Sequence, residues 1–196
     1  GVTFNGNTAS GDGGGMFNTN SDPLLINVTF HENWGDDGGA IYNSNSSPIL
    51  LNVTFWGNWN QGSGGASDSS AMLNSNSNVV IRNGIIGEDK IKNSLSTLLI
   101  SDSLLEGGCP VDATCIGTII NANAKLEPLA NNGGFTQTMG LEPASPAIDA
   151  GNNATCAETD QRGVARPQGR ACDMGAYEVD YPPEVNELEQ VGLETM

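Results

Sequence analysis

Aromatic side chains recur at a fixed spacing in the first third of the chain, and indole rings suit contact with sugar rings or with a partner protein. Trp34 and Trp59 are about 25 residues apart, a spacing typical of sequence repeats, and each directly follows an Asn. His31 and Trp56 each directly follow a Phe. If these positions lie on adjacent strands, the four side chains form one exposed aromatic ledge, a kind of surface that usually contacts something. The alternative is that aromatic pairs only stabilise neighbouring strands, each by less than about 1 kcal/mol.

Two aspartates share the same spacing. Asp12 and Asp37 each directly precede a Gly, and the next period has Ser63 at that position. Two stacked carboxylates could bind Ca²⁺ weakly through oxygen ligands. An Asp before a Gly is also common in turns for purely conformational reasons. We therefore expect turn aspartates, with calcium as a weak candidate and no other cofactor.

The elements that would position these residues are repeats. The triplet Val-Thr-Phe begins at Val2, Val28 and Val53, so the period is about 25 residues, which is typical of a solenoid. Short apolar, β-branched segments alternate with Gly, Asn, Ser and Pro, which favours strands and turns over helices. Each period then forms one coil of a parallel β-helix, with equivalent residues about 4.8 Å apart in successive coils.

Asparagines follow the same period. Asn18 and Asn43 are one period apart, as are Asn27 and Asn52, so we expect both pairs to stack and to exchange amide hydrogen bonds. A later copy of the repeat carries about six extra residues near 67–71, which are Ser-rich and predicted to bulge as a loop.

The charge balance excludes several classes of function. The chain has 23 acidic and 7 basic residues, a formal net charge of −16, and its first Lys or Arg is Arg82. A nucleic-acid partner needs a basic face, and an anionic membrane surface repels an acidic protein. The apolar runs are too short to predict a transmembrane helix, and no segment matches a signal peptide. Because the chain starts in the middle of a coil, we expect a monomeric C-terminal fragment of a larger protein.

The repeat covers residues 1–106, and residues 107–180 follow no period. This Gly- and Pro-rich segment is predicted to cap the open end of the coils, because exposed strand edges invite aggregation. Residues 181–196 form an acidic tail. The segment also holds a polar group that we interpret as an internal salt-bridge network and not as a catalytic site: Asp149, Asp160, Arg162, Arg166 and Asp173.

Four cysteines lie in this second region, and three pairings are possible. Pairing between neighbours in the sequence predicts disulfides Cys109–Cys115 and Cys156–Cys172. The spacing is not that of a zinc site, and an exported acidic β protein favours disulfides over metal.

Motifs in both regions resemble known families. Gly38–Ile41 (GGAI) and the Phe-x-x-Asn units, such as Phe30–Asn33, are similar to the repeats of polymorphic outer-membrane proteins, bacterial surface autotransporters. That resemblance implies a right-handed parallel β-helix at the cell surface. Ser145–Gly151, Asp160–Gly163 and Cys172–Glu178 resemble the choice-of-anchor Q domain that ends many bacterial surface β-helix proteins.

Catalysis finds little support in the repeats. Parallel β-helices often carry polysaccharide lyases or hydrolases, which need a basic residue beside acidic ligands or two carboxylates facing a groove. The regular coils have no Lys or Arg and one His. We therefore expect no catalytic residues and a non-enzymatic extracellular or cell-surface module, adhesin-like or a stalk, secreted or associated with the outer membrane. Its expected partners are glycans or cell-surface proteins. The alternative is a polysaccharide-binding or polysaccharide-degrading protein.

Overall fold

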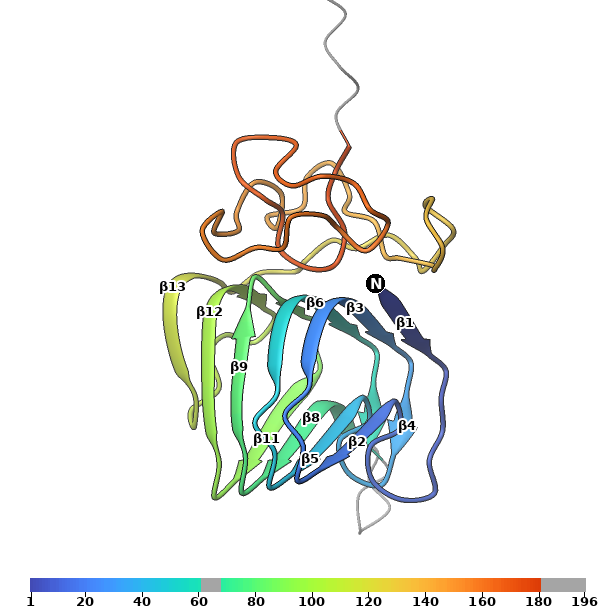
Figure 1. Ribbon diagram of the computed structural model, residues 1–196, viewed down its shortest axis with the longest axis vertical. Coiled ribbons are helices and arrows are strands. Elements are labelled where there is room, and N and C mark those ends of the chain that lie inside the picture. Colours follow the sequence, from blue (N-terminus) through green and yellow to red (C-terminus); the bar gives the residue numbers. More distant parts are fainter. Residues whose placement is uncertain (61–67, 181–196) are drawn as a thin grey trace, which may run out of the picture.

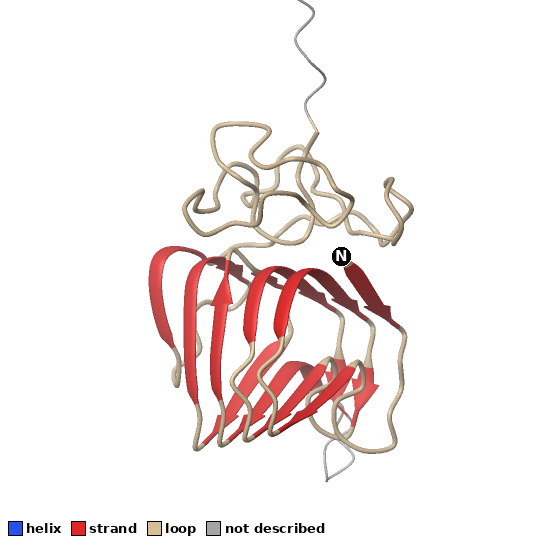
Figure 2. Ribbon diagram, in the orientation of Figure 1, coloured by secondary structure: helices blue, strands red, loops and turns tan. Residues whose placement is uncertain are grey.

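A computed structural model describes residues 1–60 and 68–180 of the chain. The described residues form strands, turns and loops with no helix, which confirms the predicted all-β class (Figure 2). Consistent with this, none of them forms a helix long and apolar enough to cross a membrane. The predicted tail, residues 181–196, lies outside the described residues.

The strands form two mainly parallel sheets, and the chain crosses from one sheet to the other several times (Figure 1). The first sheet contains β1 (Val2–Asn5), β3 (Leu24–His31), β6 (Ile49–Trp56), β9 (Asn78–Arg82), β10 (Ile85–Ile86), β12 (Thr97–Leu105) and β13 (Thr114–Ile120). The second contains β2 (Met16–Thr19), β4 (Trp34–Gly35), β5 (Ile41–Ser44), β7 (Trp59–Asn60), β8 (Asp68–Ser75) and β11 (Lys90–Ser94).

The sequence period equals the step between neighbouring strands. Val2 pairs with Val28 and Val28 with Val53, so identical residues lie side by side in β1, β3 and β6. Residues on one strand alternate between the two faces of the sheet. Each repeat therefore presents the same inward and outward side chains as its neighbour.

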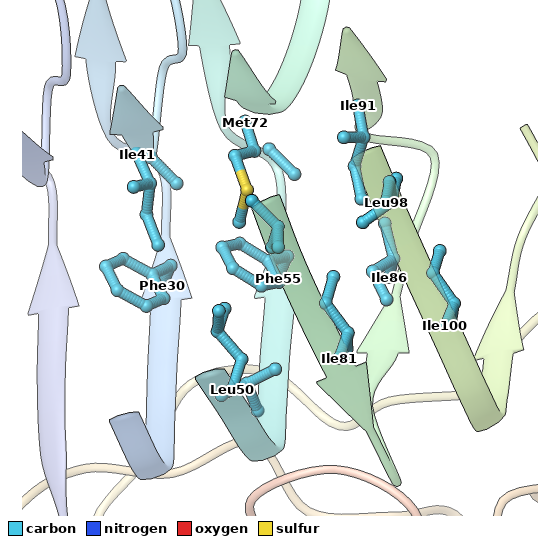
Figure 3. Packing of buried hydrophobic residues seen from close by; sticks show 14 of the residues in the cluster. Phe30, Ile41, Leu50, Phe55, Met72, Ile81, Ile86, Ile91, Leu98 and Ile100 are labelled. Carbon is cyan, nitrogen blue, oxygen red and sulfur yellow. The ribbon is translucent and has the colours of Figure 1, made fainter. Parts of the chain in front are cut away.

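The apolar core lies between the sheets (Figure 3). The rings of Phe4, Phe30 and Phe55 stack along it with centroids 4.9 Å apart. Phe30 and Phe55 are fully buried, as are Ile41 and Met72 from the second sheet. Burying each such side chain stabilises the fold by about 1.5–3 kcal/mol.

A ladder of asparagines runs along the inner side of the second sheet. The Nδ2 atoms of Asn18, Asn43 and Asn74 each donate to the Oδ1 of the next residue, ending at Asn93, with every distance 2.8 Å. The predicted pair Asn18 and Asn43 is confirmed, and the ladder extends it over two more strands.

The predicted exchange between Asn27 and Asn52 is wrong. Both residues have a left-handed backbone, with φ of 55° and 49°, at the bends of β3 and β6. Their side chains leave the stack and bind the C-terminal segment instead. Asn27 Nδ2 donates to the Thr159 carbonyl at 2.6 Å, and Asn52 Oδ1 accepts the Ala157 N–H at 2.9 Å. Asparagine adopts the left-handed conformation more readily than most residues. The need for this conformation at each bend therefore explains why asparagine recurs at this position of the repeat.

The first part of the C-terminal segment, residues 107–180, adds β13 beside β12 at the end of the stack. Residues 121–180 extend instead along the side of the stack, above β1, β3 and β6 (Figure 1). Thr3 in the first strand donates to the Gln137 carbonyl, and Thr54 accepts the Ala176 N–H. Only β13 and its neighbours thus lie at the end of the coils, as the predicted cap would, and the rest of the segment is a lateral cover. Polar side chains at the strand bends hold it, because its loops need partners for their backbone groups.

The polar network of this segment is internal, as predicted. Arg162 pairs with Asp160 at 2.8 Å and lies over the Tyr177 ring at 3.7 Å. Arg166 pairs with Glu178 at 2.7 Å, and both side chains are almost fully buried. The paired charges tie together loops that contain little regular structure.

The cysteines follow the prediction in part. Cys109 and Cys115 form a disulfide with an S–S distance of 1.99 Å. Cys156 and Cys172 are free thiols in this structure, so the second predicted disulfide is absent. Cys156 Sγ lies 3.9 Å from the Asn153 carbonyl.

The predicted bulge near residues 67–71 is also wrong where it is described. Residues 68–71 belong to the eight-residue strand β8. The N-terminal end of β8 pairs antiparallel with β7, joining Trp59 to Ser69 and Asn60 to Asp68. Four of the five residues in the predicted bulge therefore lie in a strand. Residue 67 lies outside the described residues.

Candidate functional site

Two of the predicted site residues form the floor of a groove. His31 and Trp56 end β3 and β6 and are paired in register, and Asn5 of β1 pairs with His31 on the other side. The preceding residue on each strand is an inward Phe, so these three side chains point outward. Adjacent strands are about 4.8 Å apart, so the floor spans about 10 Å.

The C-terminal segment forms the opposite wall. The groove has a volume of about 520 Å³, and Glu32 joins the floor residues on the strand side. The wall comes from the start and the end of a small loop: Leu126, Glu127, Pro128, Leu129, Gln137 and Met139. Isolated bridges between residues 126 and 141 and between residues 130 and 138 hold this loop together.

Gln161 fastens the wall to the strands. Its Nε2 donates to Thr3 Oγ1 at 2.7 Å and to Thr136 Oγ1 at 2.9 Å. Its Oε1 accepts the hydroxyl of Thr29 at 2.7 Å. The side chain is 7% exposed, so its bonds are shielded from water and set the width of the groove.

The groove suits hydrogen bonding by neutral groups. His31 Nδ1 lies 2.8 Å from Asn5 Oδ1, so in the neutral ring Nδ1 carries the proton and Nε2 is an acceptor. Partial burial lowers the pKa of His31 more than nearby Glu32 raises it, so the ring is neutral at pH 7. An indole, an imidazole and two amides match the ring faces and hydroxyls of a sugar.

The predicted aromatic ledge is divided between two surfaces. Trp34 and Trp59 stack as predicted, with ring centroids 6.2 Å apart, and are 39% and 38% exposed. They lie on β4 and β7, beyond the buried turn asparagines, and do not line the groove. Trp56 is half-buried against the second apolar cluster, and a Cβ on Gly87 would come within 2.5 Å of its ring.

The candidate calcium residues form part of an acidic turn. Partial burial raises the pKa of Asp12, and the neighbouring carboxylates of Asp37 and Asp36 raise it further. The backbone links the two turns, because Gly13 N–H donates to the Asp37 carbonyl at 2.8 Å. Among the described residues, no three metal-ligating side chains cluster in a way that could hold an ion. The weak calcium site stays a prediction.

A feature that the sequence analysis missed is the carboxylate of Asp89. A second ladder runs from Asn7 through Asn33 to Asn58, and Asn58 Nδ2 donates to Asp89 Oδ2 at 2.7 Å. Asp89 thus occupies an asparagine position, and burial raises its pKa to about 6. It lines a cavity of about 650 Å³ beside β11 and the disulfide loop. The signal that locates it in the sequence is its offset of 31 from Asn58, the same as that between Asn43 and Asn74.

The groove residues from the C-terminal segment were also missed. Glu127 and Gln137 follow no period, so no spacing in the sequence relates them to His31. Asn5 could have been found, because it lies one repeat period before His31. Comparison with known proteins adds no further residue: no protein-family model, curated protein or solved structure matches this chain.

Proposed function

We propose that this chain is a non-enzymatic module of an exported bacterial surface protein, adhesin-like or a stalk. The single observation that supports this most is the in-register pairing of identical residues over successive strands. Each repeat is stabilised by its neighbours, which suits a rigid, extendable rod. We also propose that the strands wind into a right-handed parallel β-helix of the polymorphic outer-membrane protein type, followed by a choice-of-anchor Q domain.

Export is supported by the disulfide chemistry and the charge. The Cys109–Cys115 disulfide would persist in an oxidising compartment and be reduced in a cytosol. A net charge of −16 keeps a long rod soluble and discourages self-association.

Export is tested on the protein in its producing cell. Intact cells carrying an epitope-tagged chain are treated with an external protease, with a cytosolic protein as the control. We expect the tag to be lost while the cytosolic control stays whole. A tag protected until the cells are lysed would contradict surface exposure.

Carbohydrate binding is a second candidate function, and the groove floor of Asn5, His31 and Trp56 favours it. A Trp34→Phe/Trp59→Phe variant retains Trp56 as the single tryptophan and can be titrated with soluble polysaccharides. Saturable quenching that is lost in Asn5→Ala/Gln137→Ala would support the groove, since both side chains are exposed and their loss leaves the core intact. Unchanged quenching in that variant would exclude the groove, and new reducing or unsaturated sugar ends would refute a non-enzymatic role.

A further inference from the structure

The outer face of the second sheet carries a column of apolar side chains. Phe17 of β2 pairs with Tyr42 of β5, Tyr42 with Leu73 of β8, and Leu73 with Lys92 of β11. The residues that follow each of them form the inward asparagine ladder, so this column points outward. Phe17, Tyr42 and Leu73 are called the aromatic strip below.

The aromatic strip is continuous and accessible. The rings of Phe17 and Tyr42 stack with centroids 5.2 Å apart and an angle of 8° between their planes. Phe17 is 53% exposed, and Tyr42 and Leu73 are partly exposed. The strands that carry it, β2, β5 and β8, lie on the side of the molecule opposite the C-terminal loops (Figure 1). A flat apolar surface of this kind on a polar protein indicates a contact site.

Hydroxyl groups run beside the strip at the same pitch. Thr19 pairs with Ser44, Ser44 with Ser75, and Ser75 with Ser94. The first three lie two residues after Phe17, Tyr42 and Leu73, and Ser94 lies two residues after Lys92. Successive hydroxyls are therefore about 4.8 Å apart, close to the length of one sugar residue in an extended chain. Stacked aromatic faces and a parallel row of hydroxyls match the ring faces and the hydroxyl edge of such a chain.

The charges on and around the aromatic strip indicate which kind of ligand it would bind. The chain carries a net charge of −16, yet the outward side chains of the aromatic strip and the hydroxyl row include no carboxylate. The turns at the margins of this face carry Asp12, Asp37 and Asp22, which repel polyanions. Lys92 of β11 continues the column beyond Leu73 and adds one positive charge at its end. The strip itself is uncharged and lies between acidic margins, which is complementary to a neutral ligand.

We propose that the aromatic strip binds a neutral, linear polysaccharide that lies across the strands of the second sheet. Sugar rings stack on Phe17 and Tyr42, and their hydroxyls bond to Thr19, Ser44 and Ser75. The biological use of this site rests on the proposed export, because such a ligand lies outside the cell. Binding itself is a property of the purified chain, so the two proposals can fail separately.

The test is a pull-down of the purified chain with insoluble β-glucan, chitin and mannan, quantified by depletion isotherms. A Phe17→Ala/Tyr42→Ala variant is expected to bind at least about tenfold more weakly, because it loses two aromatic contacts. The matched control is Leu24→Ala/Ile49→Ala, which removes an exposed cross-strand pair from the first sheet. The control is expected to bind like the wild type.

A Phe17→Trp/Tyr42→Trp variant separates loss of contact from loss of folding, since it keeps two aromatic faces and should retain binding. Equal weakening in the strip variant and in the Leu24/Ile49 control would overturn the proposal. So would binding of acidic polysaccharides only, or the absence of binding to every neutral one. Loss of binding in Asn5→Ala/Gln137→Ala with full binding in the strip variant would assign the ligand to the groove instead.

Discussion

Replacing Asp89 by Asn should stabilise the protein at neutral pH. Asp89 is 5% exposed and ends a ladder in which every other member is an asparagine. Asn58 donates its backbone N–H to both carboxylate oxygens at 3.1 Å and its side-chain amide to Oδ2 at 2.7 Å. An Asn at this position can accept both donors through Oδ1, as Asn33 and Asn58 already do.

The size of this stabilisation can be worked out from the raised pKa of Asp89. The pKa of Asp89 is raised from 3.8 to about 6, because burial outweighs the hydrogen bonds from Asn58, which lower it. A rise of this size corresponds to roughly 3 kcal/mol of destabilisation when the group is charged. The introduced amide accepts weaker hydrogen bonds than a carboxylate does, so we expect a net gain of about 1–3 kcal/mol at pH 8.

The stability gained by Asp89→Asn over the wild type should decrease as the pH falls. A raised pKa means that the folded protein binds the proton more tightly than the unfolded chain does. The wild type therefore gains stability relative to Asp89→Asn as the pH falls through about 6, and the difference disappears below the unfolded value of 3.8. Above pH 6 the wild type is the less stable of the two.

Urea unfolding followed by circular dichroism at pH 8, 6 and 4 measures this difference. Glu142→Gln removes an exposed carboxylate elsewhere and serves as the control. A variant less stable than the wild type at pH 8, or a difference that is the same at pH 8 and pH 4, would refute the reasoning.

Three further outcomes are expected. Cys156 should react with an alkylating reagent at pH 8 well before Cys172, because burial raises the pKa of the Cys172 thiol. Peptide mass spectrometry identifies the modified residue. If neither cysteine reacts, the assignment of both as free thiols is contradicted. Cys109→Ser/Cys115→Ser should lower the free energy of unfolding by about 2 kcal/mol, since the bridge closes a short loop, and an unchanged urea midpoint would contradict this. Asn52→Ala should lower the free energy of unfolding by about 2 kcal/mol and speed proteolysis of the C-terminal segment. The variant loses the hydrogen bond from the Ala157 N–H, and alanine adopts the left-handed backbone of this position less readily than asparagine does. Asn52→Gly should lower the free energy of unfolding by less than Asn52→Ala does, because glycine adopts the left-handed conformation without strain.

Local spacing predicted the features that depend on one repeat and its neighbour. The repeat period predicted the pairing of Trp34 with Trp59 and the hydrogen bond between Asn18 and Asn43. Such contacts follow from the period alone, because equivalent residues of adjacent parallel strands must lie side by side. The Cys109–Cys115 bridge likewise joins residues that are close in the sequence.

The repeat spacing gave a wrong prediction for Asn27 and Asn52, because one spacing is compatible with more than one backbone conformation. Asn27 and Asn52 repeat as regularly as Asn18 and Asn43, but their left-handed backbones turn the side chains outward. The period specifies which residues are neighbours but not the face on which they lie. That choice depends on the bend in each strand and on a C-terminal segment far away in the sequence, whose backbone groups need partners.

The sequence by itself thus determined the all-β class, the strand register and the acidic, base-poor character of the repeats. Only the tertiary structure decided that the C-terminal segment covers the side of the stack, that this cover makes a groove over His31 and Trp56, and that the tryptophan pair lies elsewhere. The physical reason is that these contacts join non-periodic loops to periodic strands. Their geometry depends on the packing of the whole chain, and no residue spacing encodes it.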